Sequence, residues 1–107
     1  MAFDVGAVLK EMAAAASEVL ATEGPKVKAC LKKAIEEEKD ALQAIANARI
    51  AGEIDADDMK SQIADEKEAL KAALLVCQVK GKLATQKAAN AAIKVFTAAI
   101  KIALKGV

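Results

Sequence analysis

The sequence predicts an all-α fold, an antiparallel four-helix bundle built on a central helical hairpin. Apolar side chains recur every three or four residues through most of the 107-residue chain, which is the period of one helix face. Strong helix formers dominate, and 55% of the residues are hydrophobic although only two are aromatic. We expect a chain of this length to form one helical domain, residues 1–107. Because small side chains let helices approach closely, we expect its core to be thin.

Two predicted helices, residues 25–51 and 56–79, form the hairpin. Gly52 can adopt the left-handed conformation that ends a helix, and Asp55 can cap the next helix. If the chain turns at Gly52, residues equally distant from it lie level on the two arms. Four such pairs are apolar: Ile45 with Met59, Ala41 with Ile63, Ala34 with Leu70, and Leu31 with Ala73. This agreement supports an antiparallel register.

The two outer helices are expected at residues 4–21 and 83–105. Asp4 can cap the first, and Gly24 and Pro25 suit its end and the start of the next helix. The first outer helix has one apolar face: Val5, Val8, Leu9, Met12, Ala15, Ala16 and Val19. We expect this face to pack against the hairpin.

A turn or kink at residues 80–82 is predicted by a change along one heptad position. Met59, Glu66 and Ala73 occupy this core-facing position, which continues as Lys80, Lys87, Lys94 and Lys101. The drift of a straight helix, about 20° per heptad, is too small to turn a core row into a lysine row. We therefore expect the helix to be interrupted near Gly81.

Residues 83–105 form the most apolar predicted helix. Its lysines, with Asn90 and Thr97, make one narrow polar strip, and the rest of its circumference is apolar. Because three short partner helices do not cover such a surface, we expect a homo-oligomer, most simply a twofold dimer. A cationic helix with a broad apolar face also resembles segments that lie at a membrane interface.

The register places one charged pair, Glu38 and Glu66, at core-facing positions opposite each other. Two ionised carboxylates there must share a proton, bind a cation or bend outward. A hard divalent cation such as Mg²⁺ accepts such ligands and supports phosphate chemistry. Further carboxylates flank the pair and are possible additional metal ligands: Glu37, Asp40, Asp65 and Glu68. The competing interpretation is neutralisation of the pair by ordinary salt bridges from Lys39, Lys67, Lys71 or Lys10.

The acidic residues also resemble a known pattern. Glu36-Glu37-Glu38-Lys39-Asp40 on one arm, with Asp65 and Glu68 on the other, is similar to the motifs of the MazG-type nucleoside triphosphate pyrophosphohydrolases. That family holds Mg²⁺ with Glu-Glu-x-x-Glu on one helix and Glu-x-x-Asp on the next. Here Asp40 replaces the last Glu of the first motif, and the second motif occurs only in reverse order. The resemblance covers part of the chain and implies an all-α oligomer with Mg²⁺-dependent activity on nucleotides.

The chain has two cysteines and no histidine. Without histidine, Ser-His and Cys-His catalysis and the usual ferritin-like di-iron motif are excluded, and two cysteines alone do not form a zinc site. Cys30 and Cys77 both lie on apolar faces, nearly level in the register, so they could approach one another. We interpret them as reduced core residues, and whether they pair is left open.

Charge and hydropathy exclude several classes of function. The 16 basic and 15 acidic residues nearly cancel and neither Trp nor Tyr is present, so nucleic-acid binding is not expected. No apolar run reaches the roughly 18 residues that cross a bilayer, and the amino terminus lacks the basic start of a signal peptide. We therefore expect a cytoplasmic protein.

No catalytic constellation stands out in this sequence. We expect a non-enzymatic helical module for binding or assembly, which self-associates, uses no cofactor and has a protein partner that the sequence does not identify. The alternative is a Mg²⁺-dependent nucleotide or phosphate hydrolase with Glu38 and Glu66 as metal ligands. The second alternative is peripheral membrane binding through residues 83–105.

Overall fold

The computed structural model describes residues 3–105, which form helices and, within that range, no strand. The helices are α1 (Val5–Val19), α2 (Pro25–Glu37), α3 (Lys39–Ile50), α4 (Ala56–Val76) and α5 (Lys82–Lys105). The all-α prediction is confirmed, but these residues form five helices where four were expected. None of these helices is both long enough and apolar enough to cross a membrane.

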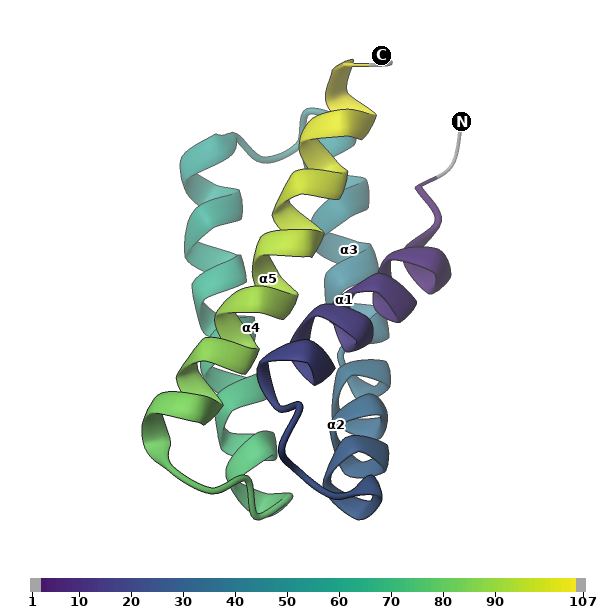
Figure 1. Cartoon of the computed structure of the whole chain (residues 1–107). Coiled ribbons are helices and arrows are strands. Elements are labelled where there is room, and N and C mark those ends of the chain that lie inside the picture. Colours follow the sequence, from purple (N-terminus) through teal and green to yellow (C-terminus); the bar gives the residue numbers. More distant parts are fainter. Residues whose placement is uncertain (1–2, 106–107) are drawn as a thin grey trace.

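The helices pack in two layers. α1 and α5 lie side by side, inclined to each other, in one layer, and α2, α3 and α4 form the other, with α2 and α3 end to end (Figure 1). Contacts of α1 with α2 and α3, and of α5 with α3 and α4, hold the layers together. The largest fully buried side chains fill the space between them: Phe96, Met12, Leu20, Leu31, Ile35, Leu42, Leu70, Leu74 and Ile100.

Capping residues set the helix ends as predicted. The Asp4 carboxylate accepts a hydrogen bond from the Ala7 N–H at 3.2 Å, and the Asp55 carboxylate accepts one from the Asp58 N–H at 2.8 Å. This bond from Asp58 also lowers the pKa of the Asp55 carboxyl. Gly52 has a φ of 78°, the left-handed conformation that ends the preceding helix. The turn of the hairpin is therefore confirmed.

The predicted interruption near Gly81 is also confirmed. α4 ends at Val76, three residues before the expected end at residue 79, and α5 begins at Lys82. Gln78 and Gly81 have φ values of 64° and 87°, so the chain leaves the helical conformation twice in this turn. The carboxylate of Glu23 accepts a hydrogen bond from the Lys80 N–H at 3.2 Å, which ties this turn to the connection between α1 and α2.

The expectation of one continuous helix over residues 25–51 is wrong, because the helix is interrupted at Glu38. The Glu38 N–H donates to the carbonyl oxygen of Ile35 at 3.1 Å, one residue short of the α-helical partner, and its ψ is −1°. This is a local 3₁₀ turn, which divides the arm into α2 and α3. Neither Gly nor Pro lies at this point, so the usual sequence signals of a kink are missing.

Candidate functional site

Glu38 and Glu66 lie together where α2 and α4 meet, as the register predicts. Glu38 sits at the break between α2 and α3, Glu66 lies on α4, and both are half-buried. Burial, then a hydrogen bond with Glu66 and the negative charges of Glu66 and Glu37, raise the pKa of the Glu38 carboxyl from 4.5 to about 8. Of the three expected outcomes for facing carboxylates, this arrangement favours a shared proton at neutral pH.

The flanking carboxylates do not join this pair. Glu37, Asp40, Asp65 and Glu68 are exposed, and Glu68 accepts a hydrogen bond from Lys71 at 3.2 Å. That contact is the one ion pair among residues 3–105, so the lysines expected to neutralise the central pair do not do so. In the same range, no group of three or more Asp, Glu, Cys or His side chains is arranged to hold a metal ion.

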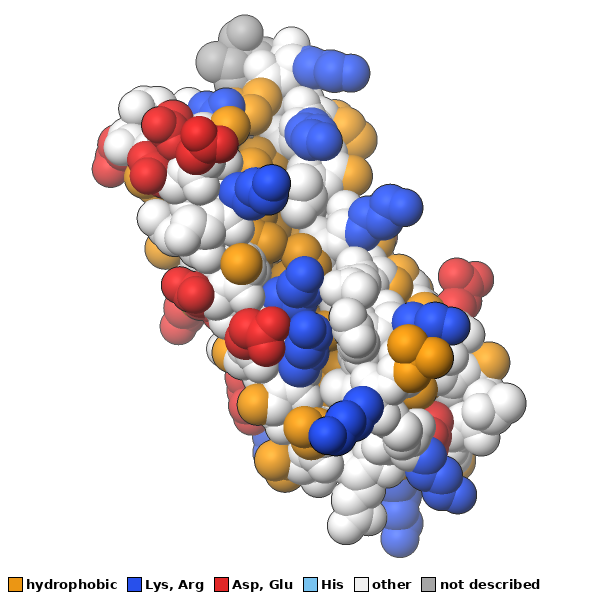
Figure 2. All heavy atoms as spheres, turned by 90° about the vertical axis from the view of Figure 1, so that its left-hand side faces the viewer, with side chains coloured by type: hydrophobic (Ala, Val, Ile, Leu, Met, Phe, Trp, Pro, Cys, Tyr) orange, Lys and Arg blue, Asp and Glu red, His pale blue; other side chains and the backbone are white. Residues whose placement is uncertain are grey.

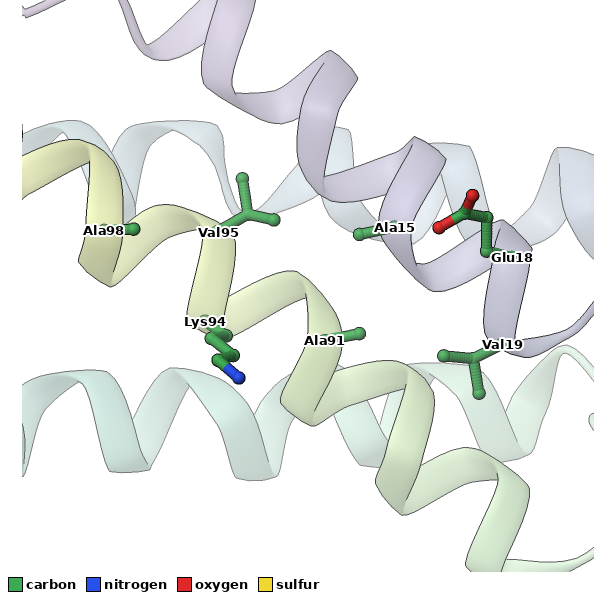
Figure 3. A pocket seen from close by; sticks show the side chains of 7 residues that line it. All are labelled: Ala15, Glu18, Val19, Ala91, Lys94, Val95 and Ala98. Carbon is green, nitrogen blue, oxygen red and sulfur yellow. The ribbon is translucent and has the colours of Figure 1, made fainter.

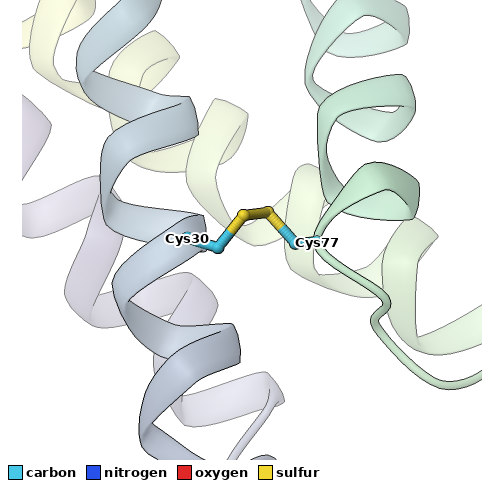
Figure 4. The surroundings of a disulfide bond; sticks show 2 residues. All are labelled: Cys30 and Cys77. Carbon is cyan, nitrogen blue, oxygen red and sulfur yellow. A yellow bond between two sulfur atoms is a disulfide. The ribbon is translucent and has the colours of Figure 1, made fainter.

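Cys30 of α2 and Cys77, which directly follows α4, form a disulfide bond (Figure 4). Their Cα atoms are 5.7 Å apart, an ordinary separation for a disulfide. The interpretation of these cysteines as reduced core residues is therefore wrong. The bond joins the two arms of the hairpin, and it forms where α4 ends and the chain turns toward α5.

A groove opens on the molecular surface between α1 and α5, with a volume of about 500 Å³. We call it the α1–α5 groove, and it is lined by Ala15, Glu18, Val19, Ala91, Lys94, Val95 and Ala98. Figure 3 shows the apolar side chains directed into the space between the two helices, with Glu18 on the α1 flank and Lys94 on the α5 flank. The groove therefore combines a floor of small apolar side chains with opposite charges on its two flanks.

The α1 side of this groove was not predicted from the sequence. Ala15 and Val19 were expected in the core, but Ala15 is half-buried and Val19 is 38% exposed. α1 and α5 lie side by side here, and Ala15 and Val19 line the surface groove between them instead of the core (Figure 1). No local sequence pattern predicts that Glu18 and Lys94 line the same groove, because the two residues are far apart in the chain.

Most of the apolar surface of α5 is turned toward the bundle. Its buried residues are Thr85, Ala88, Ala89, Ala92, Ile93, Phe96 and Ile100. Leu83 and Ile102 remain exposed, at 64% and 71%, on a helix with five lysines and no acidic residue. Figure 2 shows Lys and Arg side chains spread among apolar ones along one face of the molecule. The broad apolar face that membrane binding through α5 requires thus lies mainly in the core.

Comparison with protein-family models, curated proteins and solved structures finds no match to this chain. The resemblance to the MazG-type hydrolases therefore gains no support from a family match.

Proposed function

We propose that this protein is a self-associating helical module that forms a twofold dimer through the α1–α5 groove. One observation carries the proposal: an apolar groove lined by alanine and valine has Glu18 and Lys94 on opposite flanks. Covering apolar surface with a second copy removes it from water, which is the main favourable term in association. Small side chains let the covering helix approach closely.

The charges suit a twofold arrangement. If the dimer axis lies along the groove, α1 of one protomer covers α5 of its partner, and the reverse contact forms by symmetry. Glu18 of each protomer then faces Lys94 of the partner subunit. Because the contact is repeated, the interface contains two opposite-charge pairs around one apolar centre, and a register that faces like charges is disfavoured.

Sedimentation velocity over a range of protein concentrations tests this proposal. The wild type should pass from monomer to dimer as concentration rises. Ala98→Glu places a charge on the exposed groove floor and should shift the protein to monomer, whereas Ala72→Glu, at an exposed position on α4 outside the groove, should not. A wild type that stays monomeric at every concentration would overturn the proposal.

The Mg²⁺-dependent hydrolase and peripheral membrane binding stay predictions. For the first, the supporting feature is the half-buried pair of Glu38 and Glu66, whose shared proton competes with a cation for the same oxygens. For the second, it is the set of lysines and exposed apolar side chains on α5. Fewer described apolar side chains support either of these functions than line the α1–α5 groove.

A cytoplasmic location also stays a proposal, and the Cys30–Cys77 bond bears on it. Stable disulfides are typical of oxidising compartments, and in the cytosol they are usually transient. Rapid alkylation of cells that express the protein, followed by mass spectrometry, would show whether the two cysteines are free or bonded at the place where the protein accumulates.

A further inference from the structure

The Cys30–Cys77 bond lies at the edge of the core, where a surface hollow opens. Both cysteines line this hollow, which lies between α2 and α4 and has a volume of about 330 Å³. Cys77 is 8% exposed, and Cys30 is more exposed than Cys77. The bond can therefore be approached from solvent while the bundle stays folded. We call this space the disulfide hollow.

The walls of the disulfide hollow leave room for a small molecule. Ala34 and Ala73 provide only methyl groups, and Val76 is 81% exposed at the edge. Thiol–disulfide exchange needs direct access of a thiolate to one sulfur atom. Because Lys33 and Glu37, the two long side chains that line the hollow, are exposed, that access does not require either helix to unfold.

Two oppositely charged side chains of α2 stand beside Cys30 in the disulfide hollow. Lys33 and Glu37 both line the disulfide hollow, and they lie three and seven residues after Cys30, on the same side of α2. An ammonium group attracts an incoming thiolate and stabilises thiolate character in its surroundings. The carboxylate of Glu37 offsets this attraction, so it is the greater exposure of Cys30 that favours attack at its sulfur.

We propose that the Cys30–Cys77 bond is a thiol–disulfide exchange site that small dithiols reduce in the folded protein. A thiolate of the dithiol attacks Sγ of Cys30, forms a mixed disulfide and expels the sulfur of Cys77, which takes up a proton. The second thiol of the reagent then attacks its own sulfur in the mixed disulfide and releases Cys30 as a thiol. Two electrons pass from the dithiol to the protein, which leaves two cysteine thiols and one cyclic disulfide.

This exchange makes the covalent link between the two arms of the hairpin reversible. The bond holds α2 to α4, and the same two helices bring Glu38 and Glu66 together. Reduction releases the covalent link and leaves that contact to apolar packing and the shared proton. The inference does not depend on self-association, because the α1–α5 groove is formed by other helices.

The first test is the rate of reduction by dithiothreitol in urea concentrations below the unfolding transition. The freed thiols are alkylated and counted by mass spectrometry. If the disulfide is accessible to dithiothreitol in the folded protein, the second-order rate constant of its reduction stays constant as urea is added. A rate that rises in parallel with the unfolded population shows that reduction needs unfolding and overturns the proposal.

Two matched variants test whether the hollow is the route. Ala73→Leu fills it from α4 and should slow reduction several-fold, whereas Ala72→Leu, the neighbouring exposed position outside it, should not. Equal rates for the two variants would contradict the route. If Ala73→Leu does not fold, the urea series on the wild type still decides the proposal.

The site of attack is read from early products with glutathione as the thiol and iodoacetamide as the trap. The proposal expects glutathione on the tryptic peptide of residues 29–32, which contains Cys30, and alkylation on the peptide of residues 72–80, which contains Cys77. The opposite distribution would show that Cys77 is attacked and would refute the assignment to Cys30.

Discussion

Glu38 and Glu66 face each other where α2 and α4 pack together, and burial and the neighbouring Glu66 raise the pKa of the Glu38 carboxyl to about 8. Two ionised carboxylates facing each other would repel, so the contact depends on a proton held by Glu38. Glu38 also marks the break between α2 and α3. The protonation of one side chain is therefore linked to the point at which the first hairpin arm bends.

This contact predicts that stability declines as the pH rises. Below the ordinary pKa of 4.5, Glu38 is protonated in both the folded and the unfolded chain; between 4.5 and about 8 only the unfolded chain loses the proton. The free energy of unfolding should fall through this window and level off above it. Glu38→Gln resembles the protonated form. This variant should raise the free energy of unfolding by about 1–2 kcal/mol at neutral pH, once solvent screening is allowed for.

Urea unfolding at a series of pH values measures this difference. Glu11→Gln, a change of the same kind at an exposed position on α1, is the control and should keep the slope of the wild type. Equal pH dependence in the wild type and in Glu38→Gln would refute the role given to the shared proton.

A second prediction separates proton sharing from metal binding. A metal that binds only the folded state raises the melting temperature in step with its concentration. Because the shared proton occupies the carboxylate pair, we expect Mg²⁺ and Mn²⁺ to leave the melting temperature of the wild type unchanged at neutral pH. A rise that disappears in the Glu38→Gln/Glu66→Gln double variant would instead identify the pair as a metal site and justify a search for nucleotide substrates.

A third prediction concerns the disulfide. The bond joins residues that are 47 apart in sequence, and closing a loop of this length restricts the unfolded chain by about 4 kcal/mol in the chain-entropy description. Reduction should lower the free energy of unfolding by roughly this amount. Chemical denaturation with and without reductant measures it, and the Cys30→Ser/Cys77→Ser double variant should be as unstable as the reduced protein and insensitive to reductant. An effect of reductant on that variant would show that the loss has another cause.

Much of the fold follows from local patterns. The caps at Asp4 and Asp55, the left-handed Gly52 and the interruption near Gly81 are short-range features, and each one is present in the structure. The pairing of Glu38 with Glu66 was also predictable, because a tight turn at Gly52 fixes which residues of two antiparallel helices lie level.

Other features depend on geometry that periodicity does not contain. The break at Glu38 has no Gly or Pro to mark it. The placement of α1 beside α5, which leaves Val19 exposed and forms the α1–α5 groove, is set by how the whole core packs. The closeness of Cys30 and Cys77 follows from the register of the hairpin, but whether the two sulfur atoms are bonded is not contained in a periodic pattern.

The most direct test of the proposed dimer is a charge exchange between Glu18 and Lys94. Glu18→Lys alone faces like charges across both symmetric contacts, and so does Lys94→Glu alone, so each variant should dimerise about tenfold more weakly than the wild type. An equimolar mixture of the two variants restores both opposite-charge contacts and should form a heterodimer by sedimentation equilibrium. If the mixture associates no better than the separate variants, the arrangement of α1 over α5 of the partner is wrong.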